Sequence, residues 1–272
     1  MPTPQSYLAL DLGAESGRAV LGRFDGERLQ LSEVHRFPNG PVRLPDGLHW
    51  DILRLWTEVE RSIAMAIKDH APDLASVGLD TWGVDFGLLD RGGALIGNPY
   101  HYRDSRTDGM FEEAFRRVPR AEVFRQTGIQ CLQLNSVYQL LSMVIGESPT
   151  LEIAETFLTI PNLLNYWLTG EAVCEFSHAT TTQCYNPREE GWAKGMLKRL
   201  GIPTHIFPPI VPPGTDLGPF LPHVAQEIGL RAGAAPTVIA PACHDTGSAV
   251  AAVPAAGLDF AWISSGTWSV VG

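Results

Sequence analysis

The 272-residue sequence lacks any apolar run near the ~20 residues that a membrane-spanning helix needs. Its start, Met1–Ser6, shows no basic stretch followed by an apolar one, so we expect no secretory signal. Positive charge is scarce, because 20 Lys and Arg stand against 30 Asp and Glu and the net charge is -10. This balance disfavours nucleic acid or an anionic membrane as the main partner. We therefore predict a cytoplasmic protein with neither partner.

Cysteine is also scarce, and two common nucleotide-binding motifs are missing. The four cysteines, Cys131, Cys174, Cys184 and Cys243, have neither CxxC nor zinc-site spacing, which favours reduced, partly buried thiols. His244 follows Cys243, but neighbouring side chains point apart on a strand or helix, which disfavours a Cys–His nucleophile pair. Neither GxxxxGK[ST] nor GxGxxG occurs, so no P-loop or Rossmann site is predicted.

The N-terminal part shows a clear order of predicted strands and helices. Strands are expected at Tyr7–Leu12, at Arg18–Phe24 and, after an Asp-Gly hairpin signal, at Leu29–Phe37. Asp51 then caps an amphipathic helix that extends to about His70, and a buried strand follows at Ser76–Asp80. Three antiparallel strands, a helix and a strand predict an α/β domain with a mixed sheet. This is the opening order of a ribonuclease-H-like (actin-like) fold.

The remainder of the chain predicts a helical region and a return to strands. The stretch from about Arg103 to Leu200 is expected to be mostly helical. The proline-rich Ile202–Pro222 predicts an irregular surface crossing rather than a domain linker. A strand at Pro236–Ala240, a small-residue helix at His244–Val253 and a strand from Phe260 follow.

A weak internal repeat suggests a domain boundary. Tyr7–Gly22 and Phe260–Gly272 share one pattern: a strand, a turn of small and hydroxyl residues, and a second strand. Chance can produce one such match, but the second copy begins where a first domain should end. We expect residues 1–254 to form one domain and residues 255–272 the first hairpin of a second, truncated one.

Two polar turns near the N-terminus are candidate binding sites. In Asp11–Arg18, two glycines allow a sharp turn whose N–H groups can approach an anion, a serine adds a hydroxyl and an arginine a cation. Asp11 could hold a hydrated Mg²⁺. In Asp80–Asp85, Trp82 offers an apolar face for a sugar ring and Gly83 allows close approach. Each could equally be an ordinary turn of a β-protein.

Two further turns lie near the C-terminus. In His244-Asp245-Thr246, Asp245 could orient a sugar hydroxyl and take its proton during phosphoryl transfer. Aspartate is also a common helix N-cap, and capping explains such a residue without catalysis. Ser264–Ser269 could line an anion, or could be another polar turn.

Taken together and in order, these motifs resemble the FGGY family of carbohydrate kinases over essentially the whole chain. Two of the segments, Gly78–Phe86 and Tyr102–Thr107, make the sequence most similar to the members that act on L-rhamnulose. The full set comprises Leu10–Arg18, Gly78–Phe86, Tyr102–Thr107, Ala179–Gln183, His244–Thr246 and Ser264–Ser269.

The resemblance implies an actin-like fold of two domains that transfers the γ-phosphate of MgATP to the primary hydroxyl of L-rhamnulose. It implies that Asp245 is the general base and that Asp11 positions the metal. The implied first phosphate loop consists of Ala14, Glu15, Ser16, Gly17 and Arg18, with Thr267 in the second, and the implied sugar contacts are Gly83, His244, Asp245 and Thr246.

The family's second domain supplies most of the adenosine pocket, and this chain ends as that domain begins. We therefore expect the chain alone to bind ketose weakly, bind ATP barely and turn nothing over. Three alternatives are another FGGY kinase (for a related ketose, gluconate or glycerol), a non-catalytic sugar-binding module, and an actin-like ATPase acting on proteins. The last is disfavoured because the Trp82 and His244 segments suit a small ligand.

Overall fold

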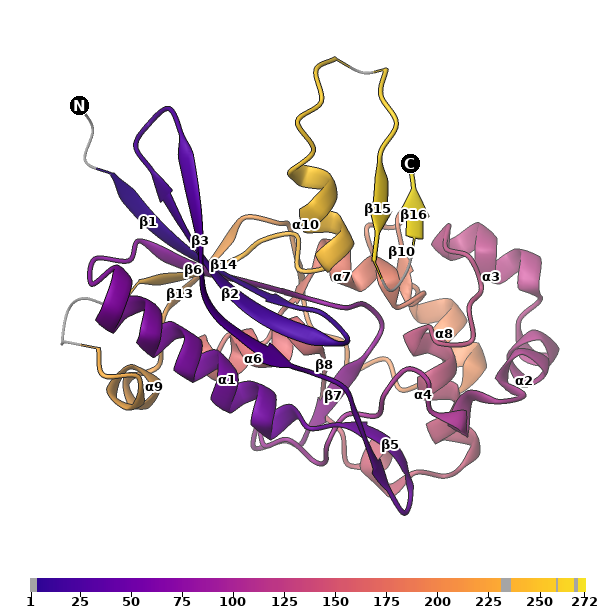
Figure 1. The fold of residues 1–272 in the computed structure, drawn as a ribbon. Helices are drawn as coiled ribbons and strands as arrows, with labels where there is room; N and C mark the ends of the chain where they lie inside the picture. Colours follow the sequence, from indigo (N-terminus) through magenta and orange to yellow (C-terminus); the bar gives the residue numbers. More distant parts are fainter. Residues whose placement is uncertain (1–3, 231–235, 258, 267–268) are drawn as a thin grey trace.

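A six-stranded mixed sheet forms the centre of the molecule (Figure 1). The computed structural model describes residues 4–230, 236–257, 259–266 and 269–272. The strand order is β13-β14-β6-β1-β2-β3, in which β1, β2 and β3 are antiparallel and β1, β6 and β14 are parallel. The bounds are β1 Gln5–Leu12, β2 Ser16–Phe24, β3 Leu29–Pro38, β6 Ser76–Thr81, β13 Thr215–Pro219 and β14 Thr237–Ala240. The predicted mixed sheet and its opening order are confirmed.

Alternation along the central strands separates a core face from a polar face. In β1, Leu8, Leu10 and Leu12 are buried, so Asp11 between them points to the opposite face. The parallel strand β6 has the same alternation and places Asp80 beside Asp11 in the register. The polar face of the sheet therefore carries carboxylates from two neighbouring strands.

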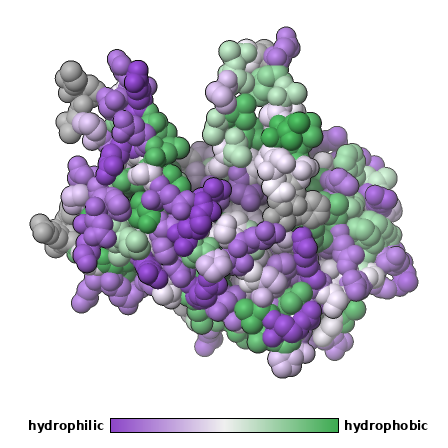
Figure 2. Space-filling view, in the orientation of Figure 1, coloured by the Kyte–Doolittle hydropathy of each residue, from purple (hydrophilic) through white to green (hydrophobic). Residues whose placement is uncertain are grey.

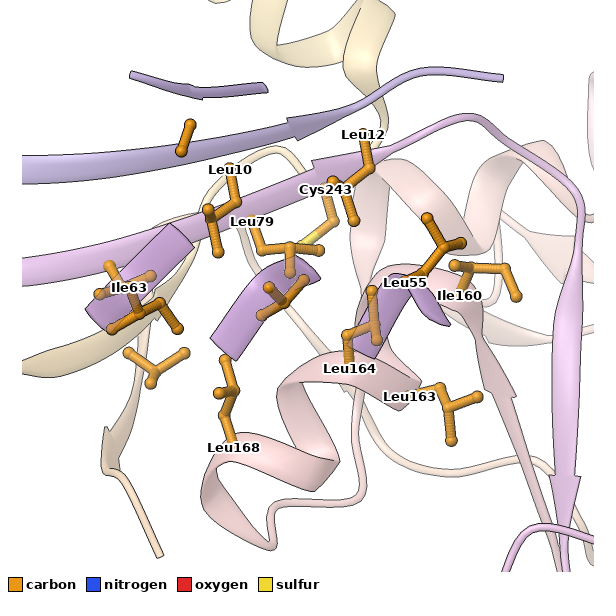
Figure 3. Packing of buried hydrophobic residues seen from close by; sticks show 14 of the residues in the cluster. Leu10, Leu12, Leu55, Ile63, Leu79, Ile160, Leu163, Leu164, Leu168 and Cys243 are labelled. Atoms are coloured by element: carbon orange, nitrogen blue, oxygen red, sulfur yellow. The ribbon is translucent and has the colours of Figure 1, made fainter. Parts of the chain in front are cut away.

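Helices α1 (Ile52–Met65) and α6 (Ile160–Thr169) cover the core face (Figure 1). Asp51 is the N-cap of α1, as predicted, and its carboxylate accepts a hydrogen bond from the Arg54 backbone N–H at 3.2 Å. After Met65 the helix continues to His70 as a π-helical turn. Figure 3 shows leucines and isoleucines of α1 and α6 meeting those of β1 and β6. Each such buried side chain contributes about 1.5–3 kcal/mol to stability.

A second apolar cluster holds the mostly helical middle of the chain together. It is centred on Tyr138, Phe157 and Trp192, which are at most 7% exposed. The predicted helical character is confirmed. The elements are β7 (Phe86–Leu89), α2 (Met110–Arg117), α3 (Arg120–Thr127), α4 (Ser136–Ile145), α5 (Pro149–Glu152), β8 (Thr156–Thr159), α7 (Phe176–Thr181) and α8 (Lys194–Leu200).

The expectation of an irregular crossing over 202–222 is wrong in part. β13 lies inside this stretch and forms an edge of the main sheet, antiparallel to β14. Ile210–Val211 (β12) also pairs with Cys174–Glu175 (β9). Prolines are tolerated here because an edge strand leaves one row of N–H groups without a ladder partner, and Pro219 is the last residue of β13.

The polar face of the sheet carries α10 (Asp245–Ala251) and, beyond it, a hairpin of β15 (Ile263–Ser265) and β16 (Ser269–Val271) (Figure 1). Apolar side chains are exposed around this hairpin, among them Phe260, Ile263 and Val271. Figure 2 shows hydrophobic residues on the projection near the top of the view, where Figure 1 has α10 and β15. Among the described residues, no helix combines the length and apolarity needed to cross a membrane.

Candidate active site

A cleft of about 860 Å³ opens on the polar face of the sheet, between the turn after β1, the end of β6 and the start of α10. Most of the sequence-predicted site residues line it together. Those residues are Asp11, Ala14, Glu15, Ser16, Arg18, Gly83, His244, Asp245 and Thr246. Ser264, Ser265 and Gly266 add a further edge, whereas Thr267 lies outside the described residues.

Gly17 is the predicted phosphate-loop residue that does not line the cleft. It is buried in β2, and a Cβ at this position would lie 2.3 Å from the Phe37 ring. A glycine is therefore required for β2 to pack against β3. Gly17 shapes the turn without facing a ligand.

The turn between β1 and β2 is closed by its own backbone and by a residue from β3's end. The Gly13 N–H donates to the Ser16 carbonyl at 2.9 Å. Asn39 donates twice to the turn, from its side chain to the Gly13 carbonyl at 2.8 Å and from its backbone to the Glu15 carbonyl at 2.9 Å. Sequence motifs missed Asn39, because its role depends on the pairing of β2 with β3.

Arg18 and Asp11 form an ion pair across the β1–β2 ladder. They are direct partners in the register, and the guanidinium Nε lies 2.8 Å from the carboxylate Oδ2. Their side chains are 48% and 34% exposed. An exposed pair of this kind is worth about 0–1 kcal/mol, so the guanidinium can turn to an anionic ligand at little cost.

Asp80 completes a group of three carboxylates with Asp11 and Asp245. Its Oδ1 is buried and has no hydrogen-bond partner among the described residues. Burial, followed by the negative charges of Asp11 and Asp245, raises the pKa of Asp80 well above its usual range. A cation placed here would relieve this repulsion, so the group suits a divalent ion. The described residues contain no ready-made three-ligand metal cluster, and a hydrated Mg²⁺ needs only one or two carboxylates.

The His244–Thr246 segment continues from β14 and opens α10. His244 occupies the N-cap position and Asp245 is the first residue of the helix, so Asp245 is not the cap. The Asp245 Oδ1 accepts the Thr246 N–H at 2.6 Å and lies 3.4 Å from His244 Nε2. Burial lowers the pKa of His244, which favours its neutral form at pH 7. Asp245 is thus a partly exposed carboxylate facing the cleft.

A buried glutamate that the motif search missed anchors this segment. Glu175 is inaccessible to solvent, and its carboxylate accepts the backbone N–H of Cys243 at 2.9 Å and the Ser177 hydroxyl at 2.6 Å. The same Ser177 oxygen accepts the His244 N–H at 3.1 Å. The residue caps α7, where glutamate is an uncommon N-cap, so sequence patterns give little indication of it.

The opposite side of the cleft is formed by Trp82, Gly83, Val84 and Tyr102. A Cβ on Gly83 would lie 3.2 Å from Thr181 and 3.3 Å from His244 Nε2, so a larger residue would crowd both. Trp82 and Tyr102 are only 5% and 8% exposed. Both residues thus line the cleft while they are almost completely packed in protein.

Curated relatives share this sequence closely. The chain is 42% identical over 268 residues to a protein named Rhamnulokinase from Bacteroides thetaiotaomicron, covering 98% of this chain and 54% of the relative. It is 41% identical to the Rhamnulokinase of Oceanobacillus iheyensis, covering 98% of this chain and 56% of that protein. The chain spans about half the length of the curated relatives it matches.

Solved structures establish the same fold. Gluconate kinase from Lactobacillus acidophilus superposes with a TM-score of 0.77 at 17% identity, over 88% of this chain and 48% of that one. A carbohydrate kinase from Novosphingobium aromaticivorans gives 0.76 at 23% identity, over 92% and 50%. The model of the FGGY family of carbohydrate kinases, N-terminal domain, matches residues 6–252. The chain therefore belongs to the FGGY family of carbohydrate kinases.

Proposed function

We propose that the full-length protein transfers the γ-phosphate of MgATP to the primary hydroxyl of L-rhamnulose, forming L-rhamnulose 1-phosphate. The observation that carries the proposal is the position of Asp245. Its carboxylate faces a cleft that has the Gly83 wall on one side and the turn at 13–18 on the other. The identity of 41–42% to proteins named Rhamnulokinase supports L-rhamnulose as the substrate.

Asp245 acts as the general base in this proposal. The sugar oxygen forms a bond to the γ-phosphorus while the bond from that phosphorus to the bridging oxygen breaks and ADP leaves. Asp245 orients the hydroxyl and takes its proton, a contribution typically worth ~10²–10⁴-fold in rate. Gly83, His244 and Thr246 hold the sugar against it.

The turn at the start of β2 receives the nucleotide phosphates. Ala14, Glu15, Ser16 and Arg18 line the cleft and supply backbone N–H groups, a hydroxyl and a cation. Asp11 would hold Mg²⁺ here, and the ion would neutralise part of the phosphate charge. We assign Thr267 to a second phosphate turn on the resemblance alone, and Gly17 to shaping the first.

We further propose that residues 1–254 form the sugar-binding domain and that residues 255–272 begin the second. The contact of α10 with both β6 and β15 lets residues on either side of this boundary line one cleft. A cytoplasmic location is supported by four free and buried cysteines. The partners are the sugar and ATP.

Steady-state kinetics with a panel of acceptors tests the substrate. The full-length protein is assayed for ADP release with L-rhamnulose, D-xylulose, D-gluconate and glycerol. We expect kcat/KM for L-rhamnulose to exceed the others by at least ~10-fold, the discrimination that a few sugar contacts provide. Preference for another acceptor would identify a different sugar kinase. Sugar binding without any turnover would favour the non-catalytic module.

A further inference from the structure

Asp85 is a fully buried carboxylate that receives hydrogen bonds from four separate parts of the chain. Its Oδ2 accepts the indole N–H of Trp50 at 2.6 Å, the indole N–H of Trp82 at 3.0 Å and the backbone N–H of Tyr102 at 3.2 Å. Its Oδ1 accepts from the Gln139 side chain at 2.9 Å. These donors come from positions 50 to 139, so Asp85 ties distant segments together.

Two of the four donors belong to residues that line the cleft. Trp82 and Tyr102 form the wall opposite the phosphate turn. Trp50 lies behind them, fully buried, with its ring centroid 3.9 Å from that of Trp82. Asp85 therefore joins into one unit the segments Gly78–Phe86 and Tyr102–Thr107, on which the resemblance to kinases of L-rhamnulose rests.

The backbone between Trp82 and Asp85 is strained. Val84 has φ of 71°, a conformation that a β-branched residue rarely adopts and that costs on the order of 1–3 kcal/mol. Its N–H donates to the Thr181 hydroxyl at 3.1 Å, and its carbonyl accepts from the Ser136 hydroxyl. The turn keeps this shape because several partners hold it, and Asp85 is the next residue.

A carboxylate is energetically unfavourable at a buried position whose role is only structural. Burial raises the pKa of Asp85 to about 6, so the ionised form is disfavoured by its surroundings. The nearby Arg106 guanidinium offsets part of this cost and donates to the Gln139 side chain at 2.6 Å. Apolar residues of similar volume often stabilise such positions at least as well. What a carboxylate offers is one oxygen that accepts three N–H donors in fixed directions.

We propose that Asp85 is a positioning residue for the sugar, fixing Trp82 and Tyr102 so that the cleft wall has one shape. It does not touch the sugar. Its removal lets the Trp82 ring and the Tyr102 backbone move, which weakens sugar binding and lowers selectivity while leaving the nucleotide side unchanged. This inference rests on the proposed sugar-kinase function.

The test is Asp85→Asn in the full-length protein, with KM measured separately for L-rhamnulose and MgATP. Asparagine keeps the shape but replaces one acceptor oxygen by an NH₂ group, which must face either the Gln139 donor or the two indole N–H groups, and it removes the charge that strengthens all four hydrogen bonds. Losing one such hydrogen bond weakens binding roughly tenfold, so we expect the sugar KM to rise about 10-fold. The MgATP KM and kcat should change less than about 2-fold, since neither the turn nor Asp245 contacts Asp85.

Asp104→Asn is the matched control. Asp104 is also buried, at 5% exposure, and accepts the backbone N–H groups of Leu48 at 2.7 Å and Arg106 at 3.0 Å. It does not line the cleft, so its substitution should lower the melting temperature without raising the sugar KM. An unchanged sugar KM in Asp85→Asn, or equal rises in both KM values, would overturn the proposal.

Two further measurements keep the outcomes distinguishable. Trp50→Phe removes one donor but leaves the carboxylate, and should raise the sugar KM about 3-fold even if Asp85→Asn does not fold. No rise in that variant counts against the proposal. The indole N–H signals of Trp50 and Trp82 in NMR spectra should move on Asp85→Asn substitution whether or not the protein is active. A wild-type protein without kinase activity overturns the proposed function, while unmoved indole signals overturn the role of Asp85.

Discussion

The two sides of the cleft are built differently. On the proposed sugar side, Trp82 and Tyr102 are almost fully buried and are fixed by a carboxylate that solvent does not reach. On the proposed phosphate side, Arg18 and Asp11 are 48% and 34% exposed and are held mainly by each other. One side is fixed by the core before any ligand arrives. The other consists of charges that can rearrange around a ligand.

The difference fits the chemistry assigned to each side. Sugars that differ in one hydroxyl or methyl group are distinguished by which of their groups find partners in the site, and a wall of fixed shape keeps those partners in place. Phosphates carry charge, so mobile cations and backbone N–H groups suffice to bind them. We therefore expect substitutions on the two sides to affect different kinetic constants.

The largest effect is expected at the residue between the two sides. Asp245→Asn retains the size of the side chain and an oxygen for the Thr246 N–H, but removes the base. We expect kcat to fall by at least ~10²-fold with little change in melting temperature. Asp216→Asn, an exposed position on β13, is the control and should keep full activity. Preserved turnover with a lowered melting temperature would mean that Asp245 only stabilises α10.

The next effect is expected on the buried side. Trp82→Leu removes the indole that donates to Asp85, at a residue that lines the cleft. The KM for L-rhamnulose should rise by about 10-fold or more, while the KM for MgATP stays within about 2-fold. Steady-state kinetics with each substrate varied in turn measures both. A larger effect on MgATP than on sugar would place the nucleotide on this side.

A smaller effect is expected on the exposed side. Arg18→Ala removes the cation and leaves Asp11 without its partner. Because the site is exposed and screened, we expect the KM for MgATP to rise only about 3–10-fold, with sugar binding unchanged. Arg23→Ala is the control, since Arg23 lies on the same strand but donates to the His70 carbonyl outside the cleft. Equal changes in the two KM values would contradict the assignment of the turn at 13–18 to the nucleotide phosphates.

The smallest effect concerns pH and stability. The pKa of Asp85 is about 6 in the folded protein, against an ordinary value of 3.8. As the pH falls from 6 to 4, Asp85 takes up a proton in the folded protein before it does so in the unfolded chain. The contribution of Asp85 to the free energy of unfolding therefore increases as the pH falls. His178, whose pKa burial lowers to about 3, acts in the opposite direction.

The contribution of Asp85 to the pH dependence of stability is isolated by comparing wild type with Asp85→Asn, because His178 is present in both. The melting temperature of wild type relative to the variant should increase by about 2–4 °C between pH 7.5 and pH 4.5. Thermal unfolding at several pH values provides the measurement. A difference that does not change with pH would show that Asp85 keeps an ordinary pKa.

The exposed side was largely predictable from the sequence, whereas on the buried side Trp82 and Gly83 were predicted but the contacts that fix them were not. The turn at 13–18 lies within one hairpin, so its glycines, hydroxyl and arginine appear in a continuous stretch. The helix after Asp51 was equally clear because its apolar spacing repeats over several turns. Local patterns identify elements that are complete within a short segment.

The role of Asp85 depends on contacts with Trp50 and Gln139, which lie 35 and 54 residues away in sequence. No local pattern indicates such partners. The same limit explains β13, whose membership of the sheet depends on pairing with β14, and α7, which has six residues and too few turns to show a period.

The most direct test of the two-sided cleft is the double variant Trp82→Leu/Arg18→Ala in the full-length protein. Both KM values are measured and compared with those of the single variants. If the sides act independently, the double variant should show the sugar KM of Trp82→Leu and the MgATP KM of Arg18→Ala, each within about 2-fold. A sugar KM that shifts further when Arg18 is removed, or a MgATP KM that shifts further when Trp82 is removed, would contradict the separation of the two sides.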